Sequence, residues 1–480
     1  MVASPPQPTT LGALRASGWQ PVPVREEIRR NVLTRIIERR PVVEGVLGFE
    51  DTVVPQLEHA LLAGHDLILL GERGQAKSRI IRSLVELLDE WVPKIAGSEI
   101  NDDPFHPVSR YARDLVSDVG DETPVSWVHR SDRYGEKLAT PDTSIADLIG
   151  EVDPIKVAEG RYLSDELTIH YGLVPRCNRG IFAVNELPDL AERIQVGLLN
   201  VLEERDVQIR GYRVRLPLDV LLVASANPDD YTSRGRIITP LKDRFGAQIR
   251  THYPPDVETE MAIVAQEARP VRLEGVDVEM PPFMAEIVAR LSQLARESPR
   301  VNQRSGVSVR LSVANHETLL AAALRRALRC HERDAVPRVS DLESLLSSTL
   351  GKVEVESLEE GEDADIVRQL LHTAVLHTFR EHVPPTRLPE VVAAFSPGSE
   401  GVEQTAEVGA DVPAADYERL LGEIAPLGAI AESVAGAGSS LGMRSSAAEL
   451  VLEGLHLSRR LNKDQSGGRS VFKARNRAER

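Results

Sequence analysis

DLILLGERGQAKS, residues 66–78, places an apolar run, a glycine-containing turn and the start of a helical pattern next to one another. Residues 67–70 are all Leu or Ile, which is typical of a buried strand. The helical pattern begins at Lys77 and Ser78. Unpaired N–H groups and the positive end of the helix dipole favour anions at such a helix start. This order of elements therefore predicts a phosphate-binding loop.

The residue types in this loop indicate ATP as the ligand. We expect the Lys77 ammonium to reach the β- and γ-phosphates and the Ser78 hydroxyl to ligate Mg²⁺. Ala76 stands where the usual G-x-x-x-x-G-K-[ST] pattern has its second glycine, at the point where the helix begins. The alternative interpretation is an accidental glycine-rich turn. Motifs further along the chain distinguish it from a phosphate-binding loop. The residues expected to cradle the nucleotide are Gly71, Glu72, Arg73, Gly74, Gln75, Ala76, Lys77 and Ser78.

A second apolar run, in RGIFAVNELPDL at residues 179–190, ends in the polar pair Asn185 and Glu186. In P-loop ATPases an acidic residue after such a strand holds Mg²⁺, and a following Glu can polarise the attacking water. Glu186 is in position for the second role. Asn185 replaces the usual Asp at the metal and brings no charge, so we expect slower hydrolysis or weaker Mg²⁺ binding. A buried strand with a polar end is the alternative interpretation.

A third apolar run, VLLVASANP at residues 220–228, carries Asn227 at its end. This amide is suited to orient the lytic water or to contact the γ-phosphate. Apolar runs that alternate with helical or loop sequence indicate a parallel sheet covered by helices. In open sheets of that kind, ligands bind at the carboxyl ends of the strands.

The order of these motifs, followed by LKDRFG at residues 241–246, resembles an AAA+ ATPase. It is most similar to the branch that holds the MoxR-type ATPases, which commonly carry Ala-Lys in the P-loop, and the ATPase subunit of magnesium chelatase. Residues 147–174 resemble the hairpin insertion in helix 2 of that branch. Residues 198–211 resemble its helix before sensor 1 and the following β-hairpin. The resemblance covers roughly residues 41–330.

The resemblance assigns roles to single residues. Lys77 and Ser78 match the Walker A lysine and hydroxyl, and Asn185 and Glu186 match the Walker B pair. Sensor 1, the arginine finger and the sensor 2 arginine correspond to Asn227, Arg244 and Arg310. Plainer interpretations stay open for both arginines. Arg244 is next to Asp243 and can form a surface ion pair, and Arg310 is one of several arginines in its region.

The resemblance also implies Mg²⁺-ATP as the cofactor and a homo-oligomeric ring, expected to be a hexamer. The partner would be a metal-insertion complex with chelatase-type subunits, or a protein complex matured with a von Willebrand A domain protein. A nucleotide-switched scaffold with little hydrolysis is the alternative that Asn185 motivates. An enhancer-binding transcriptional activator is a further alternative, but we see no GAFTGA-like loop and no helix-turn-helix in the sequence.

Composition and charge argue against nucleic-acid binding, a membrane span and secretion. The net charge of −16 argues against a dominant nucleic-acid mode. The exception is the C-terminal stretch of residues 459–480, which holds eight basic and two acidic side chains. No apolar stretch approaches the roughly 18 residues of a membrane span. The N-terminus does not have the pattern of a secretory signal, so we expect a cytoplasmic protein.

The expected fold class is α/β, with a P-loop AAA+ core of parallel sheet, flanking helices and β-hairpin insertions. A helical lid and a further helical C-terminal region are expected to follow. The expected segments are a flexible arm (1–30), the α/β core (31–255), the lid (256–352), an acidic linker and helix (353–395), a linker (396–414), C-terminal helices (415–462) and a basic disordered tail (463–480).

Overall fold

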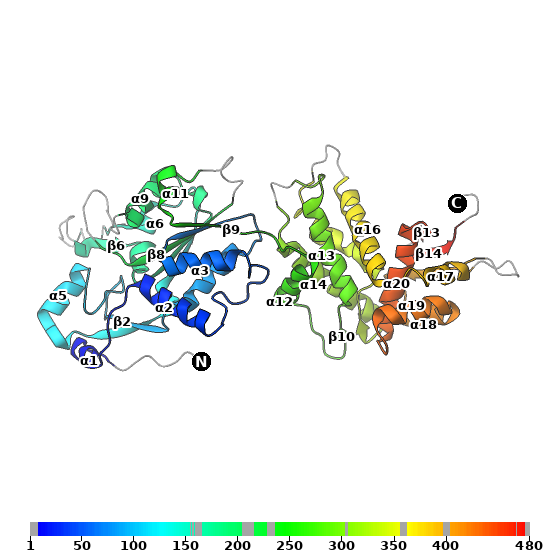
Figure 1. Ribbon diagram of the computed structural model, residues 1–480, viewed down its shortest axis with the longest axis horizontal. Helices are drawn as coiled ribbons and strands as arrows, with labels where there is room; N and C mark the ends of the chain where they lie inside the picture. Colours follow the sequence, from blue (N-terminus) through cyan, green and yellow to red (C-terminus); the bar gives the residue numbers. More distant parts are fainter. Residues whose placement is uncertain are drawn as a thin grey trace. The chain divides into compact units, whose positions relative to one another are not determined.

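The computed structural model of the chain contains two compact units, Met1–His252 and Tyr253–Arg480 (Figure 1). Each unit has a hydrophobic core of its own. The structure describes residues 8–153, 155, 158, 166–203, 216–227, 236–302, 306–355, 362–396, 404–466 and 468–475.

The first unit is built on a five-stranded sheet in the order β4-β7-β8-β1-β9. Every neighbouring pair in this sheet is parallel, so the carboxyl ends of the strands meet at one edge. The central strands β1, β7 and β8 are buried along their whole length. The five strands are β1 (Leu67–Leu70), β4 (Tyr134–Leu138), β7 (Gly180–Asn185), β8 (Val220–Ala226) and β9 (Ala247–Arg250).

Helices cover both faces of this sheet, as the sequence predicted (Figure 1). Because side chains alternate between the faces of a strand, Ile181 and Ala183 of β7 pack with one layer of helices and Phe182 and Val184 with the other. The first layer is α2 (Val24–Ile37), α3 (Val53–Ala63) and α4 (Lys77–Ser83), and the second contains α6 (Ile145–Leu148), α8 (Leu173–Arg176), α9 (Glu192–Glu203) and α11 (Thr239–Arg244).

Smaller elements complete the first unit. An antiparallel pair, β5 with β6, lies in the segment that resembles a helix 2 insertion. The middle of that segment, including residues 160–162, and the expected hairpin at 207–211 lie outside the described residues. The remaining elements are α1 (Leu11–Ala16), β2 (Trp91–Ile95), α5 (Arg110–Val119), β3 (Val125–His129), β5 (Gly150–Val152), β6 (Ile169–Tyr171) and 3-10 helices at Leu84–Leu87, Gly120–Glu122, Arg130–Arg133, Glu166–Thr168 and Leu187–Asp189.

The second unit is mainly helical, and one core joins the region expected to be a lid to the C-terminal helices. Helix α20 lies in the middle of this core and packs against α16, α18 and α19. The helices are α12 (Val257–Glu267), α13 (Pro282–Glu297), α14 (Val309–Cys330), α15 (Leu346–Thr349), α16 (Glu362–His382), α17 (Leu388–Ala394), α18 (Ala414–Glu423), α19 (Ala425–Ala435), α20 (Leu441–Leu457) and a 3-10 helix at Val339–Leu345. Two short strands, β10 (Asp277–Val278) and β11 (Asp334–Ala335), form a separate pair.

Residues 461–466 and 469–474 form strands, whereas the sequence predicted a disordered tail from residue 463 onward. Strands β13 (Leu461–Ser466) and β14 (Arg469–Ala474) form a hairpin, and β14 also pairs with β12 (Ala406–Gly409), inside the expected linker. Leu461 and Phe472 are each 1% exposed. Lys463, Arg469 and Lys473 form ion pairs with acidic side chains, as in the Lys463–Glu453 pair at 2.7 Å. The prediction was wrong because it weighed charge and overlooked apolar residues that reach the core.

The N-terminal arm also contains structure. Helix α1 lies within it, with Leu11 and Leu14 buried, and helix α2 begins at Val24. The Trp127 indole donates a hydrogen bond of 2.9 Å to the Pro8 carbonyl, which ties the arm to β3. In the parts of the chain that the structure describes, no helix combines the length and the apolar character needed to cross a membrane.

Candidate nucleotide-binding site

The loop after β1 is closed by contacts that leave no room for a side chain at Gly71. The Gly71 N–H donates to the Ala226 carbonyl at 3.1 Å. A Cβ atom at Gly71 would lie 1.9 Å from Thr251 Oγ1 and 2.2 Å from Gln75 Oε1. Glycine is therefore required at this position by the packing of the loop itself.

Gln75 and Thr251 hold the loop in shape. The Gln75 side-chain carbonyl accepts from the Glu72 N–H at 3.0 Å and from the Thr251 hydroxyl at 2.8 Å. Thr251 follows β9 and is buried. Sequence reasoning missed Thr251, because nothing in the motif spacing links a residue this distant to the P-loop.

Two loop residues have left-handed backbone conformations. Gly74 has φ +79°, which suits glycine. Ala76 has φ +54° and ψ +11° and stands immediately before helix α4, as its N-cap residue. A left-handed conformation costs a residue with a Cβ atom about 1–2 kcal/mol. The space is available for Ala, but the backbone at this position favours the glycine of the usual motif.

Lys77 is 7% exposed and turns back over the loop. Its ammonium donates to the Glu72 carbonyl at 2.8 Å and also to the Gly71 carbonyl. Ser78 follows in the first turn of α4 and is partly exposed. The cationic group thus lies at the mouth of the loop, where anionic oxygens would replace the carbonyls as its partners.

Strand register brings the predicted residues of the other two motifs to the same edge. Val184 pairs with Ala224, and Leu70 pairs with Ala226. One residue further along, Asn185 is therefore level with Ser225, and Gly71 is level with Asn227. Asn185 and Asn227 are 8% and 6% exposed. The structure thus brings the P-loop and the ends of β7 and β8 together.

A chain of hydrogen bonds joins the ends of β7 and β8. The Glu186 N–H donates to Ser225 Oγ at 3.3 Å, and the Ser225 hydroxyl donates to Asn185 Oδ1 at 3.2 Å. Glu186 has φ +55° and ψ +50°, a left-handed conformation that is rare for Glu. Such strain in a non-glycine residue is typical of functional sites, where the surrounding structure enforces it.

Glu136 on β4 is an acidic neighbour that sequence reasoning missed. It accepts from Asn185 Nδ2 at 2.5 Å, from the Tyr134 hydroxyl at 3.0 Å and from Arg82 Nε and Nη2 at 2.8 and 2.9 Å. The hydrogen bond from Arg82 is the largest cause that holds the pKa of Glu136 below its usual range, although burial opposes it. Burial, with Glu136 close by, raises the pKa of Tyr134. A carboxylate therefore lies beside Asn185, the residue predicted to hold the uncharged Walker B position.

The two predicted arginines lie in different units. Arg244 ends α11 in the first unit and is exposed. Arg310 lies in the first turn of α14 in the second unit, and it is exposed as well.

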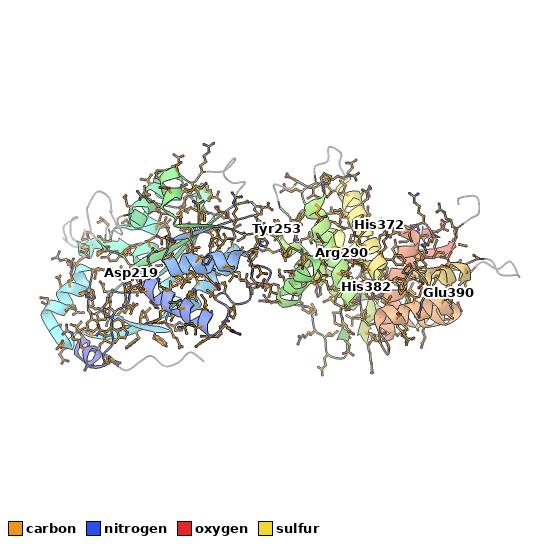
Figure 2. All side chains as sticks on the ribbon, viewed as in Figure 1. Asp219, Tyr253, Arg290, His372, His382 and Glu390 are labelled. Carbon is orange, nitrogen blue, oxygen red and sulfur yellow. The ribbon has the colours of Figure 1, made fainter. Side chains whose placement is uncertain are left out.

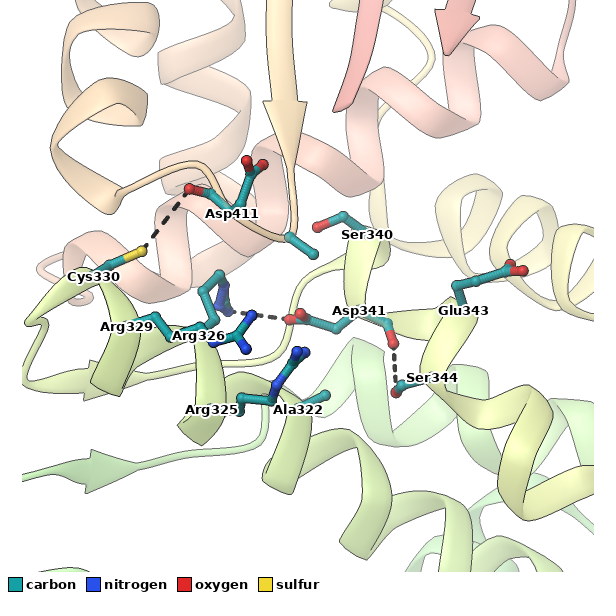
Figure 3. A pocket seen from close by; sticks show the side chains of 11 residues that line it. Ala322, Arg325, Arg326, Arg329, Cys330, Ser340, Asp341, Glu343, Ser344 and Asp411 are labelled. Atoms are coloured by element: carbon teal, nitrogen blue, oxygen red, sulfur yellow. Dashed lines mark hydrogen bonds and ion pairs between the residues drawn. The ribbon is translucent and has the colours of Figure 1, made fainter. Parts of the chain in front are cut away.

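A pocket of about 350 Å³ in the second unit is lined by both basic and acidic side chains (Figure 3). Arg326 and Asp341 form an ion pair of 3.1 Å at its base, and both side chains are 2% exposed. Burial raises the pKa of Asp341 to about 6, against the opposing effect of Arg326. None of the residues predicted from the sequence lines this pocket.

The chain is similar to a family model and to curated proteins. The Sigma-54 interaction domain model matches residues 158–239. The magnesium-chelatase subunit ChlI of Anabaena variabilis is 28% identical over 238 residues, which are 46% of this chain and 64% of the relative. The magnesium-chelatase 38 kDa subunit of Cereibacter sphaeroides is 28% identical over 240 residues, 48% of this chain and 61% of the relative. The chain thus spans less than two thirds of each relative's length.

Among solved structures, a complex between subunits BchI and BchD of magnesium chelatase contains a similar chain. The structural match covers 70% of this chain and 96% of that chain at 21% sequence identity, with a TM-score of 0.35. The sequence relatives, together with the parallel sheet and the P-loop at its carboxyl edge, identify the chain as an AAA+ protein whose homologues are magnesium-chelatase subunits.

Proposed function

We propose that the chain binds and hydrolyses ATP with Mg²⁺ and uses the energy to remodel a partner protein or a metal-insertion complex. The observation that carries this proposal is the meeting of Lys77, Asn185, Glu186 and Asn227 at one edge of a parallel sheet, beside the start of helix α4. Ligand sites of open α/β sheets occur at this edge.

The residues present fit Mg²⁺-ATP. The loop N–H groups and the Lys77 ammonium would bind phosphate oxygens, while the Ser78 hydroxyl and the Asn185 amide oxygen would hold the metal. When bound, Mg²⁺ neutralises charge that develops on the phosphates. Glu186 would orient the attacking water and accept its proton, and Asn227 would fix that water from the neighbouring strand.

A second subunit would complete the site. Arg244 is exposed at the end of α11, where a guanidinium can reach a nucleotide held by another copy of the chain. We therefore propose a homo-oligomeric ring, a hexamer in the first instance. Its partner would be chelatase-type subunits or a von Willebrand A domain protein. We place the activity in the cytoplasm, which suits the unpaired thiols of Cys177 and Cys330.

Asn185 favours one alternative, a nucleotide-switched scaffold that hydrolyses ATP slowly. Asn185 donates to Glu136 and accepts from Ser225, but its side chain has no charge to hold the metal. A protein of this kind would bind nucleotide tightly and change partners with the nucleotide state, with little turnover.

Steady-state ATP hydrolysis tests the proposal. We expect activity that requires Mg²⁺, rises more steeply than linearly with protein concentration and falls by about 100-fold or more in Glu186→Gln, as for loss of a general base. Glu192→Gln, an exposed carboxylate in the first turn of α9, is the matched control and should leave the rate unchanged.

A fluorescent ADP analogue measures binding separately from turnover. Lys77→Ala should abolish binding, whereas Glu186→Gln should retain it. Binding without turnover in the wild-type protein would favour the scaffold. Absence of binding in the wild type would contradict both functions.

A further inference from the structure

The Walker B position of this chain lacks the charge that a P-loop metal site uses. The side chain at the end of β7 is the neutral amide of Asn185. The carboxylate of Glu136, on the adjacent strand β4, accepts a hydrogen bond from that amide at 2.5 Å. The negative charge missing from one strand is therefore present on its neighbour.

Strand geometry places this carboxylate on the face that bears the P-loop helix. Glu136 pairs with Ala183 in the parallel β4–β7 register. Ala183 and Asn185 are two residues apart, so Glu136 and Asn185 share a face of the sheet. Ala183 packs in the core that contains Ile80 and Ile81 of α4.

Helix α4 also brings its metal-binding hydroxyl toward this carboxylate. Arg82 of α4 holds Glu136 with two hydrogen bonds of 2.8 and 2.9 Å. Ser78 lies four residues before Arg82, and residues at this spacing lie on the same face of a helix. The side of α4 that carries the Ser78 hydroxyl is therefore the side that meets Glu136.

The carboxylate also fixes which way the amide points. An ionised carboxylate only accepts hydrogen bonds, so the amide nitrogen of Asn185 has to face Glu136. The amide oxygen then faces Ser225, whose hydroxyl donates to it at 3.2 Å. An amide oxygen has two lone pairs, so one remains for a metal ion or a metal-bound water. Glu136 and Ser225 together therefore fix the orientation of the Asn185 amide.

We propose that Glu136 is a positioning residue that replaces the Walker B aspartate from the neighbouring strand. It supplies the negative charge and presents the oxygen of Asn185 to Mg²⁺. The inference rests on the proposed nucleotide site and assigns the electrostatics of its metal side. A salt bridge to Arg82 alone does not explain the arrangement, because Arg82 is 65% exposed and exposed pairs contribute little stability, whereas Glu136 is only 19% exposed.

A charge swap tests this proposal. The readout is the Mg²⁺ concentration that gives half of the metal-dependent gain in affinity for a fluorescent ADP analogue, measured against an EDTA baseline. Glu136→Gln should raise this concentration by about tenfold, which corresponds to a free energy near 1.4 kcal/mol. The double variant Glu136→Gln, Asn185→Asp moves the charge back to β7 and should return it to within about threefold of wild type.

Asn185→Asp by itself should not improve Mg²⁺ binding. It would place two carboxylates within hydrogen-bonding distance, and like charges that close disfavour ionisation of both. The matched controls are Tyr134→Phe and Arg82→Gln, each of which removes hydrogen bonds to Glu136 and keeps its charge. Both should leave the Mg²⁺ requirement within about twofold of wild type.

An unchanged Mg²⁺ requirement in Glu136→Gln would overturn the proposal. It would also be overturned if Arg82→Gln raised the requirement as much as Glu136→Gln does, since the ion pair would then be the cause. If Glu136→Gln does not fold, Asn185→Asp decides, because tighter Mg²⁺ binding in that variant would contradict the charge replacement. Absence of ADP binding by the wild-type protein both with Mg²⁺ and in EDTA would instead contradict the nucleotide site itself.

Discussion

At the residue scale, the P-loop has an alanine, Ala76, at a position where the backbone conformation favours glycine. Ala76 has the left-handed conformation in which glycine is most stable. Glu186, at the end of β7, shares this conformation. These two residues belong to the two motifs that meet at the sheet edge, so both proposed binding motifs carry a left-handed residue with a Cβ atom.

Ala76→Gly should therefore be tolerated or stabilising. Removing the Cβ atom relieves about 1 kcal/mol or more of backbone strain, while the unfolded chain gains entropy worth about 0.4–1 kcal/mol. Chemical denaturation should show a change in the free energy of unfolding between zero and about 1 kcal/mol in favour of the variant. The same exchange at the exposed Ala321 within helix α14 should destabilise by about 1 kcal/mol. Equal losses in both variants would contradict the strain at Ala76.

Gly71→Ala should disrupt the loop and weaken nucleotide binding. Its new Cβ would overlap Thr251 Oγ1 and Gln75 Oε1, the two groups that hold the loop together. We expect affinity for a fluorescent ADP analogue to fall by at least about tenfold, equivalent to 1.4 kcal/mol. Gly422→Ala in helix α18 is the control, because its Cβ would meet no atom within 4 Å. Unchanged ADP binding in Gly71→Ala would show that the loop rearranges on binding.

These residues show what sequence reasoning can reach at a site. Sequence reasoning predicted Lys77, Asn185 and Asn227 because each follows an apolar run, and parallel strands bring such ends together. Glu136 and Thr251 were missed for a physical reason. Glu136 contacts Asn185, and Thr251 contacts Gln75. Neither residue lies in a recognisable motif, and both contacts depend on the strand register, which cannot be read from the sequence.

At the element scale, helix α2 is attached to the sheet by buried polar groups. Glu27 of α2 accepts from Arg133 Nη1 and Nη2 at 2.8 and 2.6 Å, and both side chains are at most 3% exposed. Asp219, labelled in Figure 2, accepts from the Val24 N–H at 2.6 Å at the start of the same helix. Burial raises the pKa of Asp219, with the hydrogen bond from Val24 opposing it.

Glu27→Ala should be strongly destabilising, because it leaves the Arg133 guanidinium buried without its carboxylate. We expect a loss of about 3–5 kcal/mol in the free energy of unfolding of the first unit. Glu26→Ala is the matched control one position earlier. Glu26 pairs with Arg29 on the surface, where the two side chains are 53% and 33% exposed, so the cost should stay below about 1 kcal/mol. Similar losses in both variants, measured by urea denaturation, would contradict this account.

The same scale explains why the C-terminal hairpin was missed. Charge runs are ordinarily solvated, and the stretch after residue 459 is strongly basic. Strands β13 and β14 nevertheless fold because Leu461 and Phe472 enter the core of the second unit. The acidic partners Glu453 and Asp411 lie elsewhere in the chain and became apparent only in the structure.

At the scale of the whole molecule, the two units have separate cores. The α/β class of the first unit followed from its alternating strand and helix patterns. The large core that joins the expected lid to the C-terminal helices did not, because its contacts join segments that a linker-like sequence separates. Because the cores are separate, a ligand or a core mutation in one unit should change the thermal stability of that unit alone.

Calorimetry of the intact chain should therefore resolve two thermal transitions with different sensitivities. Excess ADP with Mg²⁺ should stabilise only the first unit, by about 2.7 kcal/mol at a ligand concentration of 100 times Kd. Phe472→Ala should destabilise only the second unit, by about 3–5 kcal/mol, because its ring is 1% exposed in that core. The fragments 1–252 and 253–480, expressed separately, assign the transitions. If ADP and Phe472→Ala both shift a single transition, the units unfold together, and the free energy of nucleotide binding then stabilises the helical unit as well.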